Sequence, residues 1–248
     1  AEFQLLQEQH GERWAEEDKG IEQKLDALQE KHGKRPNIIH LMWDDMKYGA
    51  IGHPMLNNVK GYVSPNINKR AAPGMTCTRR YLESTCTARR AGAMTGRQPV
   101  RSGMILPIFP IHKMGLPGSE VTIAEVLDDD YNTGFFEKSH FGDQEESYLH
   151  NQGFDEAIFT LYNQFAGQMF TPEAEADFMT VGWEDDELSP YALDTNFRPK
   201  EWVWAVEGFE GKKGKEISTP AVVAEYHEFN TMAYGRVKQF IQKHAKDD

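Results

Sequence analysis

The chain has 248 residues, 39% of them hydrophobic and 27% charged, which is enough for one large domain or two small ones with a sizeable core. Its formal net charge of −12 disfavours sequence-independent binding to nucleic acid, because such binding needs a positively charged face. No apolar run approaches the length of a membrane span, and the 2 cysteines are too few for a disulfide framework. The composition indicates a globular protein, and any anion-binding site in it must be a local cluster of basic residues.

The first predicted element is an amphipathic helix over residues 3–32. Apolar residues recur there at roughly helical spacing among Glu, Gln and Lys, and Gly33 is a suitable stop. The pattern favours a solvated helix that packs one stripe on the body of the protein. A coiled coil that binds a partner is the alternative.

Short apolar runs and helical patterns alternate along the rest of the chain. Three runs are predicted to be buried strands, namely 38–43, 132–136 and 156–161. Further helices are predicted to begin at Ser64-Pro65 and to cover 87–94, 122–130 and 220–245. Residues 162–217 show no clear period, which predicts long surface excursions. The alternation predicts an α/β fold with a mostly parallel central sheet flanked by helices.

Cys86 stands at the start of the helix predicted over 87–94. The chain gathers six arginines around it, namely Arg79, Arg80, Arg89, Arg90, Arg97 and Arg101. The N-terminus of a helix favours negative charge, and Arg90 lies one turn beyond Cys86 on the same face, whereas Arg89 points elsewhere. The pattern indicates a nucleophile beside an anion site; a buried, inert cysteine with solvated arginines is the alternative.

Two adjacent carboxylates, Asp44 and Asp45, follow the first predicted strand. In open α/β sheets, ligands bind beyond the carboxyl ends of the strands. Adjacent carboxylates repel one another unless they share a cation, and their hard oxygen atoms suit Ca²⁺ or Mg²⁺. A solvated turn is the alternative for an isolated pair, but the neighbouring motifs favour a cation site.

The segment from Cys86 to Arg97, CTARRAGAMTGR, resembles the sulfatase signature C-x-P/A-x-R-x4-T-G-R, with Ala88 where most members have Pro. The segment DDMKYGAIG, which begins at Asp44, resembles the D-D-x-x-x-G-x-x-G segment of the same family. Two further segments, SPNINKRAAPGM and NQGFDEAI, resemble its T-P-N-I-D-x-L-A-x-x-G-M and G-F-D segments. The motifs stand in the order that the family has.

A fifth segment, EKSHFG, ends the second predicted strand and resembles the G-K-x-H-x-G segment of the family. Lys138 and His140 match its lysine and histidine, and Glu137 replaces its first glycine. The resemblance implies a fold similar to alkaline phosphatase. It also implies a sulfuric-ester hydrolase of the arylsulfatase type that acts on a small-molecule sulfate ester.

The resemblance also implies roles for individual residues. Cys86 would be converted after translation to formylglycine, whose hydrated aldehyde is the nucleophile. Asp44 and Asp45, together with the modified residue 86, would hold a divalent cation, Ca²⁺ or alternatively Mg²⁺.

The remaining roles concern the sulfate group and a proton. Arg90 and Lys138 would bind the sulfate and balance negative charge at the nucleophile. His140 would take the proton of the second hydroxyl of the hydrated aldehyde, so that sulfate leaves.

The resemblance begins near Arg35. We therefore assign residues 1–34 to an N-terminal helical extension and residues 35–248 to the N-terminal part of a sulfatase catalytic domain. In the family a second half supplies another histidine and lysine and an Asp-Asn pair that completes the metal shell; LDTNF, at 193–197, has neither the order nor the setting. We expect the chain alone to be inactive, with the missing C-terminal part of the same enzyme as its partner.

Other functions stay open at this point. Formylglycine chemistry also serves phosphonate and phosphodiester hydrolases, and a non-catalytic binding or assembly protein would keep a vestigial site. A plain cysteine hydrolase would need a general base beside an intact thiol. The aromatic-rich residues 159–204 would either line a pocket for an aryl or sugar group or pack as loops. The acidic composition and the lack of a leader favour a periplasmic or secreted location.

Overall fold

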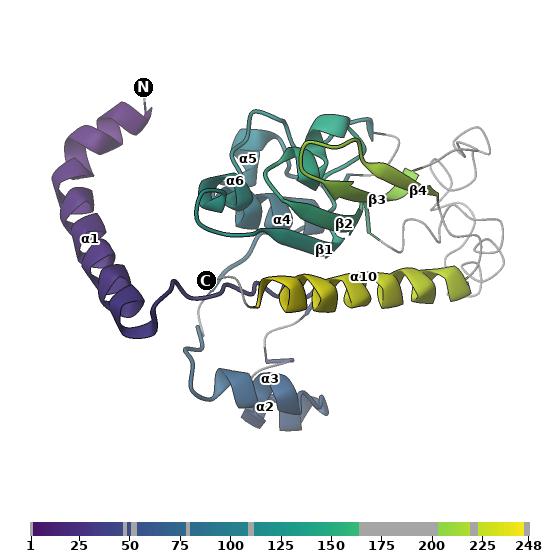
Figure 1. Ribbon diagram of the computed structural model, residues 1–248, viewed down its shortest axis with the longest axis horizontal. Coiled ribbons are helices and arrows are strands. Elements are labelled where there is room, and N and C mark those ends of the chain that lie inside the picture. Colours follow the sequence, from purple (N-terminus) through teal and green to yellow (C-terminus); the bar gives the residue numbers. More distant parts are fainter. Residues whose placement is uncertain are drawn as a thin grey trace. The chain divides into compact units, whose positions relative to one another are not determined.

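The computed structural model describes residues 2–46, 49–50, 54–77, 80–108, 112–163, 203–218 and 223–245 (Figure 1). The chain divides into two compact units, one that ends at Trp43 and one that runs from Asp44 to Ala245. Most of the aromatic-rich stretch lies at 164–202, outside the described residues. Its described ends, Phe159 and Trp204, are buried in the core rather than lining a pocket.

The first unit holds one long helix, α1 (Glu2–His32), as predicted. Gly33 ends it with a φ of 77°, and the Gly33 N–H donates to the carbonyl oxygen of Gln29 at 2.7 Å. Glycine adopts this left-handed conformation without the steric cost that a Cβ would add. The apolar residues Ile21 and Leu25 on this helix are 53% and 40% exposed.

The predicted strand at 38–43 is wrong. This segment is irregular, with Ile39 70% exposed and Leu41 65% exposed. An apolar run states a preference for burial, but a strand also needs a neighbour that satisfies its backbone hydrogen bonds. The sequence of this segment shows the preference for burial, but it does not show whether a neighbouring strand is available.

The second unit is built on a sheet of four strands in the order β1-β2-β3-β4. The strands are β1 (Gly134–Lys138), β2 (Glu156–Thr160), β3 (Val203–Phe209) and β4 (Lys215–Ser218). The pair β1–β2 is parallel, and the pairs β2–β3 and β3–β4 are antiparallel. The structure confirms the predicted strands near 132–136 and 156–161.

The prediction of surface excursions over 162–217 is wrong for its last part, 203–217, where most of the β3–β4 hairpin lies. Its strand VWAVEGF is rich in aliphatic and aromatic residues, as strands are, but stands among acidic and turn residues. Trp204, Ala205 and Val206 are fully buried. The segment forms a strand because it pairs with β2, which is far away in the sequence, and a local sequence pattern cannot predict that pairing.

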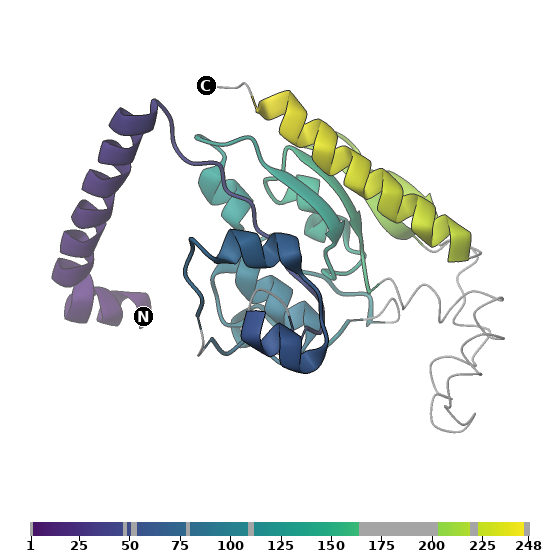
Figure 2. The same ribbon diagram turned by 90° about the horizontal axis from the view of Figure 1, so that it is seen from below.

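Helices pack on both faces of the sheet (Figures 1 and 2). On one face, α10 (Val223–His244) packs Phe229 and Ala233 against Ile158 and Trp204. On the other face, Ala157 and Phe159 join a larger core with residues of α4 (Cys86–Thr95) and α6 (Ile123–Leu127). Successive residues of β2 thus face opposite layers, as the pleat of a strand requires.

The remaining elements are short: α2 (Pro54–Lys60), α3 (Pro65–Ala71), α5 (Pro99–Ser102), and the 3-10 turns η2 (Glu145–Ser147) and η3 (Leu149–Asn151). The helices predicted from Ser64-Pro65 and over 87–94, 122–130 and 220–245 are present as α3, α4, α6 and α10. Thr122 and Glu125 form a reciprocal capping box at the start of α6. Among the described residues, no helix is long and apolar enough to cross a bilayer.

Phe229→Ala tests how α10 is held on the sheet. The ring of Phe229 lies 4.6 Å from that of Trp204 and is 4% exposed. Its removal leaves a cavity, so we expect a loss of about 3–4 kcal/mol in the free energy of unfolding, measured by urea denaturation. Met232→Ala on the same helix, where the side chain is 39% exposed, should cost less than about 1 kcal/mol. Equal losses in the two variants would contradict this packing.

Candidate active site

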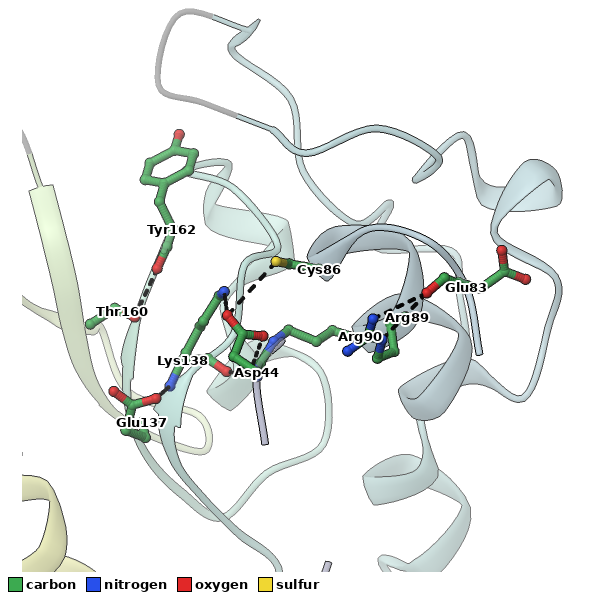
Figure 3. Close-up of polar contacts among 9 residues, drawn as sticks. All are labelled: Asp44, Glu83, Cys86, Arg89, Arg90, Glu137, Lys138, Thr160 and Tyr162. Carbon is green, nitrogen blue, oxygen red and sulfur yellow. Dashed lines mark hydrogen bonds and ion pairs between the residues drawn. The ribbon is translucent and has the colours of Figure 1, made fainter. Parts of the chain in front are cut away.

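Helix α4 presents Cys86 and Arg90 on one face. Thr85 is the extended N-cap residue, so Cys86 is the first residue of the helix. Arg90 follows one turn later and is 7% exposed. Arg89 instead directs its guanidinium to the carbonyl oxygen of Glu83, with Nη2 at 3.3 Å (Figure 3). The helical spacing predicted this division between the two arginines.

The end of β1 presents the second half of the site. Lys138 is its last residue and is 4% exposed, and His140, two residues later, is 2% exposed. Nη1 of Arg90 donates to the carbonyl oxygen of Lys138. This contact joins the start of α4 to the end of β1 directly, so the two elements position their side chains as one group.

Asp44 lies between these two elements (Figure 3). Its Oδ1 accepts a hydrogen bond from Nη2 of Arg90 at 3.2 Å, and its Oδ2 accepts one from Nζ of Lys138. The thiol of Cys86 donates to the same Oδ2 at an Sγ–Oδ2 distance of 3.7 Å. Burial raises the pKa of Asp44, but the hydrogen bond and positive charge of Lys138, with those of Arg90, outweigh it and hold this pKa below its usual 3.8. Asp44 is therefore ionised at neutral pH.

Asp44, Asp45 and Cys86 offer a group of potential metal-ligand atoms. One atom from each lies within 4.8 Å of the others. The two carboxylates suit a hard cation such as Ca²⁺ or Mg²⁺, whereas a thiol is a soft ligand and suits neither. The donor set fits such a cation only if residue 86 carries oxygen in place of sulfur.

His140 is a buried, neutral imidazole. Its Nε2 lies 2.9 Å from the carbonyl oxygen of Ile108, so Nε2 carries the proton and donates it. Its Nδ1 is buried and has no hydrogen-bond partner within the described part of the chain. Burial lowers the pKa of His140 to about 4; the charges of Lys138 and Arg90 act in the same direction, and the hydrogen bond to Ile108 and the charge of Asp44 oppose it without offsetting the effect of burial. At neutral pH the Nδ1 lone pair is therefore free to accept a proton.

The backbone is strained at this site. Of the four described non-glycine residues with positive φ, three belong to the segments that form it: Asp45 at 49°, Glu137 at 94° and His140 at 61°. Such conformations cost roughly 1–3 kcal/mol each and concentrate at functional sites. Glu137 stands where the resembling motif has glycine, and its backbone has kept a conformation that glycine adopts without strain.

The end of the cysteine motif has a structural task. Oγ1 of Thr95 donates to the carbonyl oxygen of Ala91 at 2.8 Å, and Gly96 ends α4 in the left-handed conformation. Arg97 binds both carboxylate oxygens of Glu120, each at 2.7 Å, and Glu120 is 6% exposed. Arg97 therefore anchors the end of α4 through a partner that no local pattern marked. The expectation that the arginines gather around the thiol is met by Arg90, whereas Arg89 and Arg97 bind elsewhere.

The sequence signals and the fold together define the protein class. The family model named Sulfatase matches residues 36–215, and the chain belongs to this family. The fold agrees: a crystal structure of PsFucS1 sulfatase from Pseudoalteromonas sp. superimposes with a TM-score of 0.72 and 29% identity, covering 94% of this chain and 45% of that one. The α/β class predicted from the sequence is confirmed by this likeness, although the described sheet is mixed rather than mostly parallel.

Curated relatives point the same way. The chain is 39% identical over 174 residues to arylsulfatase A of Homo sapiens, covering 65% of this chain and 32% of that protein. It is 40% identical over 116 residues to steryl-sulfatase of Homo sapiens, covering 44% of this chain and 19% of that protein. The chain thus spans a third or less of the length of these two relatives.

The lowered pKa of His140 predicts a dependence of stability on acid. Its folded pKa of about 4 lies below the usual 6.5, so the unfolded chain takes up the proton first. The contribution is complete above pH 6.5 and is lost as the pH falls towards 4, by up to roughly 3 kcal/mol. His140→Gln, which can still donate to Ile108, should flatten the curve of unfolding free energy between these pH values.

The exposed His227 on α10 is the matched control. His227→Gln should leave the slope of the wild-type curve unchanged. If His140→Gln also leaves it unchanged, the imidazole is not held neutral by its surroundings.

Proposed function

We propose that this chain carries the nucleophile and anion-binding half of a sulfuric-ester hydrolase of the arylsulfatase type, acting on a small-molecule sulfate ester. The observation that carries the proposal is the position of Cys86. It is the signature cysteine of the family and lies at the start of α4, with its Sγ 3.7 Å from a carboxylate that Arg90 and Lys138 hold. Nucleophile, carboxylate and cations thus meet at one point.

The nucleophile is formylglycine, formed from Cys86. Once hydrated, it supplies an attacking oxygen and replaces the soft sulfur by a ligand that suits a hard cation. Its place at the N-terminus of α4 favours negative charge on that oxygen, because the first N–H groups of a helix have no partner within the helix and the helix dipole is positive there.

The charges of the site support a divalent cation, Ca²⁺ or alternatively Mg²⁺. The carboxylates of Asp44 and Asp45 are balanced by Arg90 and Lys138, so these four side chains leave no surplus positive charge for a sulfate anion. Asp44, Asp45 and residue 86 would hold a divalent cation, which would supply that surplus positive charge and Lewis-acid polarisation of the sulfate group. Two carboxylates fill only part of the roughly six to eight oxygen positions of Ca²⁺, so we expect further ligands from the C-terminal part of the same enzyme.

Arg90 and Lys138 bind and orient the sulfate. Both are almost fully buried, so their charges act in a low-dielectric setting where they stabilise developing negative charge strongly. Nε of Arg90 is a buried donor with no hydrogen-bond partner among the residues described, which is rare in native proteins and calls for an acceptor. A sulfate oxygen is an acceptor of the required kind.

His140 receives a proton. Its Nε2–H is committed to Ile108, which fixes the tautomer and leaves Nδ1 as the basic atom. In the proposed reaction, Nδ1 takes the proton of the second hydroxyl of the hydrated aldehyde, so that the aldehyde re-forms and sulfate leaves. The periplasmic or secreted location expected from the sequence stays a prediction.

The conversion of Cys86 is directly measurable. In protein from its native source, the tryptic peptide Tyr81–Arg89 should have lost its sulfur and should react with a hydrazide probe for aldehydes. Cys77, which is exposed and outside the motif, serves as the internal control and should keep its thiol. An intact thiol at residue 86 in a protein that hydrolyses sulfate esters would disprove the formylglycine mechanism. In a protein without that activity, it would favour the non-catalytic alternative.

Arg90→Ala should lower the turnover of an aryl sulfate by the natural protein by roughly 10²–10³, because it removes one preorganised contact to developing charge. Arg89→Ala is the matched control: it removes the same side chain one residue earlier, where the guanidinium binds the Glu83 carbonyl. We expect the control to stay within a few-fold of wild type. A loss of less than a few-fold for Arg90→Ala would remove Arg90 from the site.

A further inference from the structure

Lys138 lies on the outer edge of the described sheet. The N–H of Ser139 donates to the carbonyl oxygen of Thr160 at 3.0 Å, so the backbone of Ser139 faces β2. Successive residues of a strand direct their backbone groups to opposite sides, so the N–H and C=O of Lys138 face away from β2. Because β1 is the first strand in the sheet order, these two groups need partners from outside the ladder.

Charged side chains supply both partners. Oε2 of Glu137 accepts a hydrogen bond from the N–H of Lys138 at 2.6 Å. Nη1 of Arg90 donates to the carbonyl oxygen of Lys138 (Figure 3). Hydrogen bonds to ionised groups are roughly twice as strong as those between neutral groups. The backbone of Lys138 is therefore fixed at its N–H by a carboxylate and at its C=O by a guanidinium.

The same backbone carries the ammonium that binds Asp44. Nζ of Lys138 donates to Oδ2 of Asp44, and Arg90 binds the other oxygen of that carboxylate. A shift of the Lys138 backbone would therefore move the ammonium relative to Asp44 and to Cys86. Glu137 acts on this geometry through one hydrogen bond.

Glu137 accepts the hydrogen bond from Lys138 while its own backbone is in a conformation that is unfavourable for a residue with a side chain. Its φ of 94° is one that glycine adopts freely and that a residue with a Cβ rarely does. Strain of this kind persists only where the surrounding contacts compensate it. The short hydrogen bond that its carboxylate accepts from the N–H of Lys138 is such a contact.

We propose that Glu137 is a positioning residue of this site, whose carboxylate fixes the end of β1 so that the Lys138 ammonium lies on Asp44. Its effect on turnover rests on the proposed sulfatase function. Its effect on the backbone of Lys138 does not.

Three substitutions at one position separate positioning from stability. Glu137→Gly removes the acceptor and relieves the strain, Glu137→Ala removes the acceptor and keeps the strain, and Glu137→Gln keeps an acceptor of the same reach. In the natural protein we expect about a tenfold fall in kcat for an aryl sulfate in the glycine and alanine variants. The glutamine variant should stay within about threefold of wild type.

Thermal unfolding of the same variants supplies the contrast. The glycine variant should melt at or above the wild-type temperature, because its backbone is relaxed, while its kcat falls. A purely structural role would make turnover follow stability, with glycine as the best variant and alanine as the worst. Wild-type kcat in the glycine variant would overturn the proposal.

The backbone contact is tested without turnover. In protein labelled with ¹⁵N-lysine, the amide proton of Lys138 should resonate far downfield in the wild type and the glutamine variant, and should move upfield in the glycine and alanine variants. An unchanged Lys138 amide in the glycine variant would overturn the proposal. If the wild type fails to hydrolyse the aryl sulfate, the proposed function fails, while the amide signal still decides whether Glu137 holds Lys138.

Discussion

Positive charge beside a half-buried carboxylate lowers its pKa and favours the ionised form, and the site of this protein depends on that interaction at Asp44. Burial alone would raise its pKa, but Lys138 and Arg90 bind one oxygen each and lower it. The two cations come from different elements, the end of β1 and the second turn of α4. The hydrogen bond from Arg90 to the Lys138 carbonyl holds the helix and the strand in a fixed position relative to each other. The rest of the second unit serves to bring these two ends together.

The packing of the sheet explains how it does so. β2 pairs with β1 in parallel and sends alternate side chains to the two helical layers, so α4 and α10 are fixed on opposite faces of one sheet. Arg97 then ties the end of α4 to the buried Glu120, which leaves the start of the helix to present Cys86 and Arg90. Asp45, Glu137 and His140 have positive φ angles, and such conformations cost stability and concentrate at functional sites.

Features encoded locally were predictable, and features that depend on distant partners were not. A glycine stop and helical spacing predicted α1 and the different directions of Arg89 and Arg90, because both depend on neighbours within one turn. The strand β3 was missed, and a strand at 38–43 was predicted where none exists, because pairing is decided by segments far along the chain. The Arg97–Glu120 pair and the left-handed backbone of Glu137 likewise have no local signal in the residue types. The residues that carry the motifs were nevertheless found, since chemistry restricts their identity and spacing.

The measurement that tests the central claim most directly is the turnover of an aryl sulfate by the natural protein, beside that of a phosphate diester with the same leaving group. The account predicts that the sulfate ester is the better substrate, because the chain belongs to the sulfatase family. Hydrolysis of the diester alone would contradict the assignment of substrate while keeping the chemistry of the site. Failure to hydrolyse either ester would contradict the account as a whole.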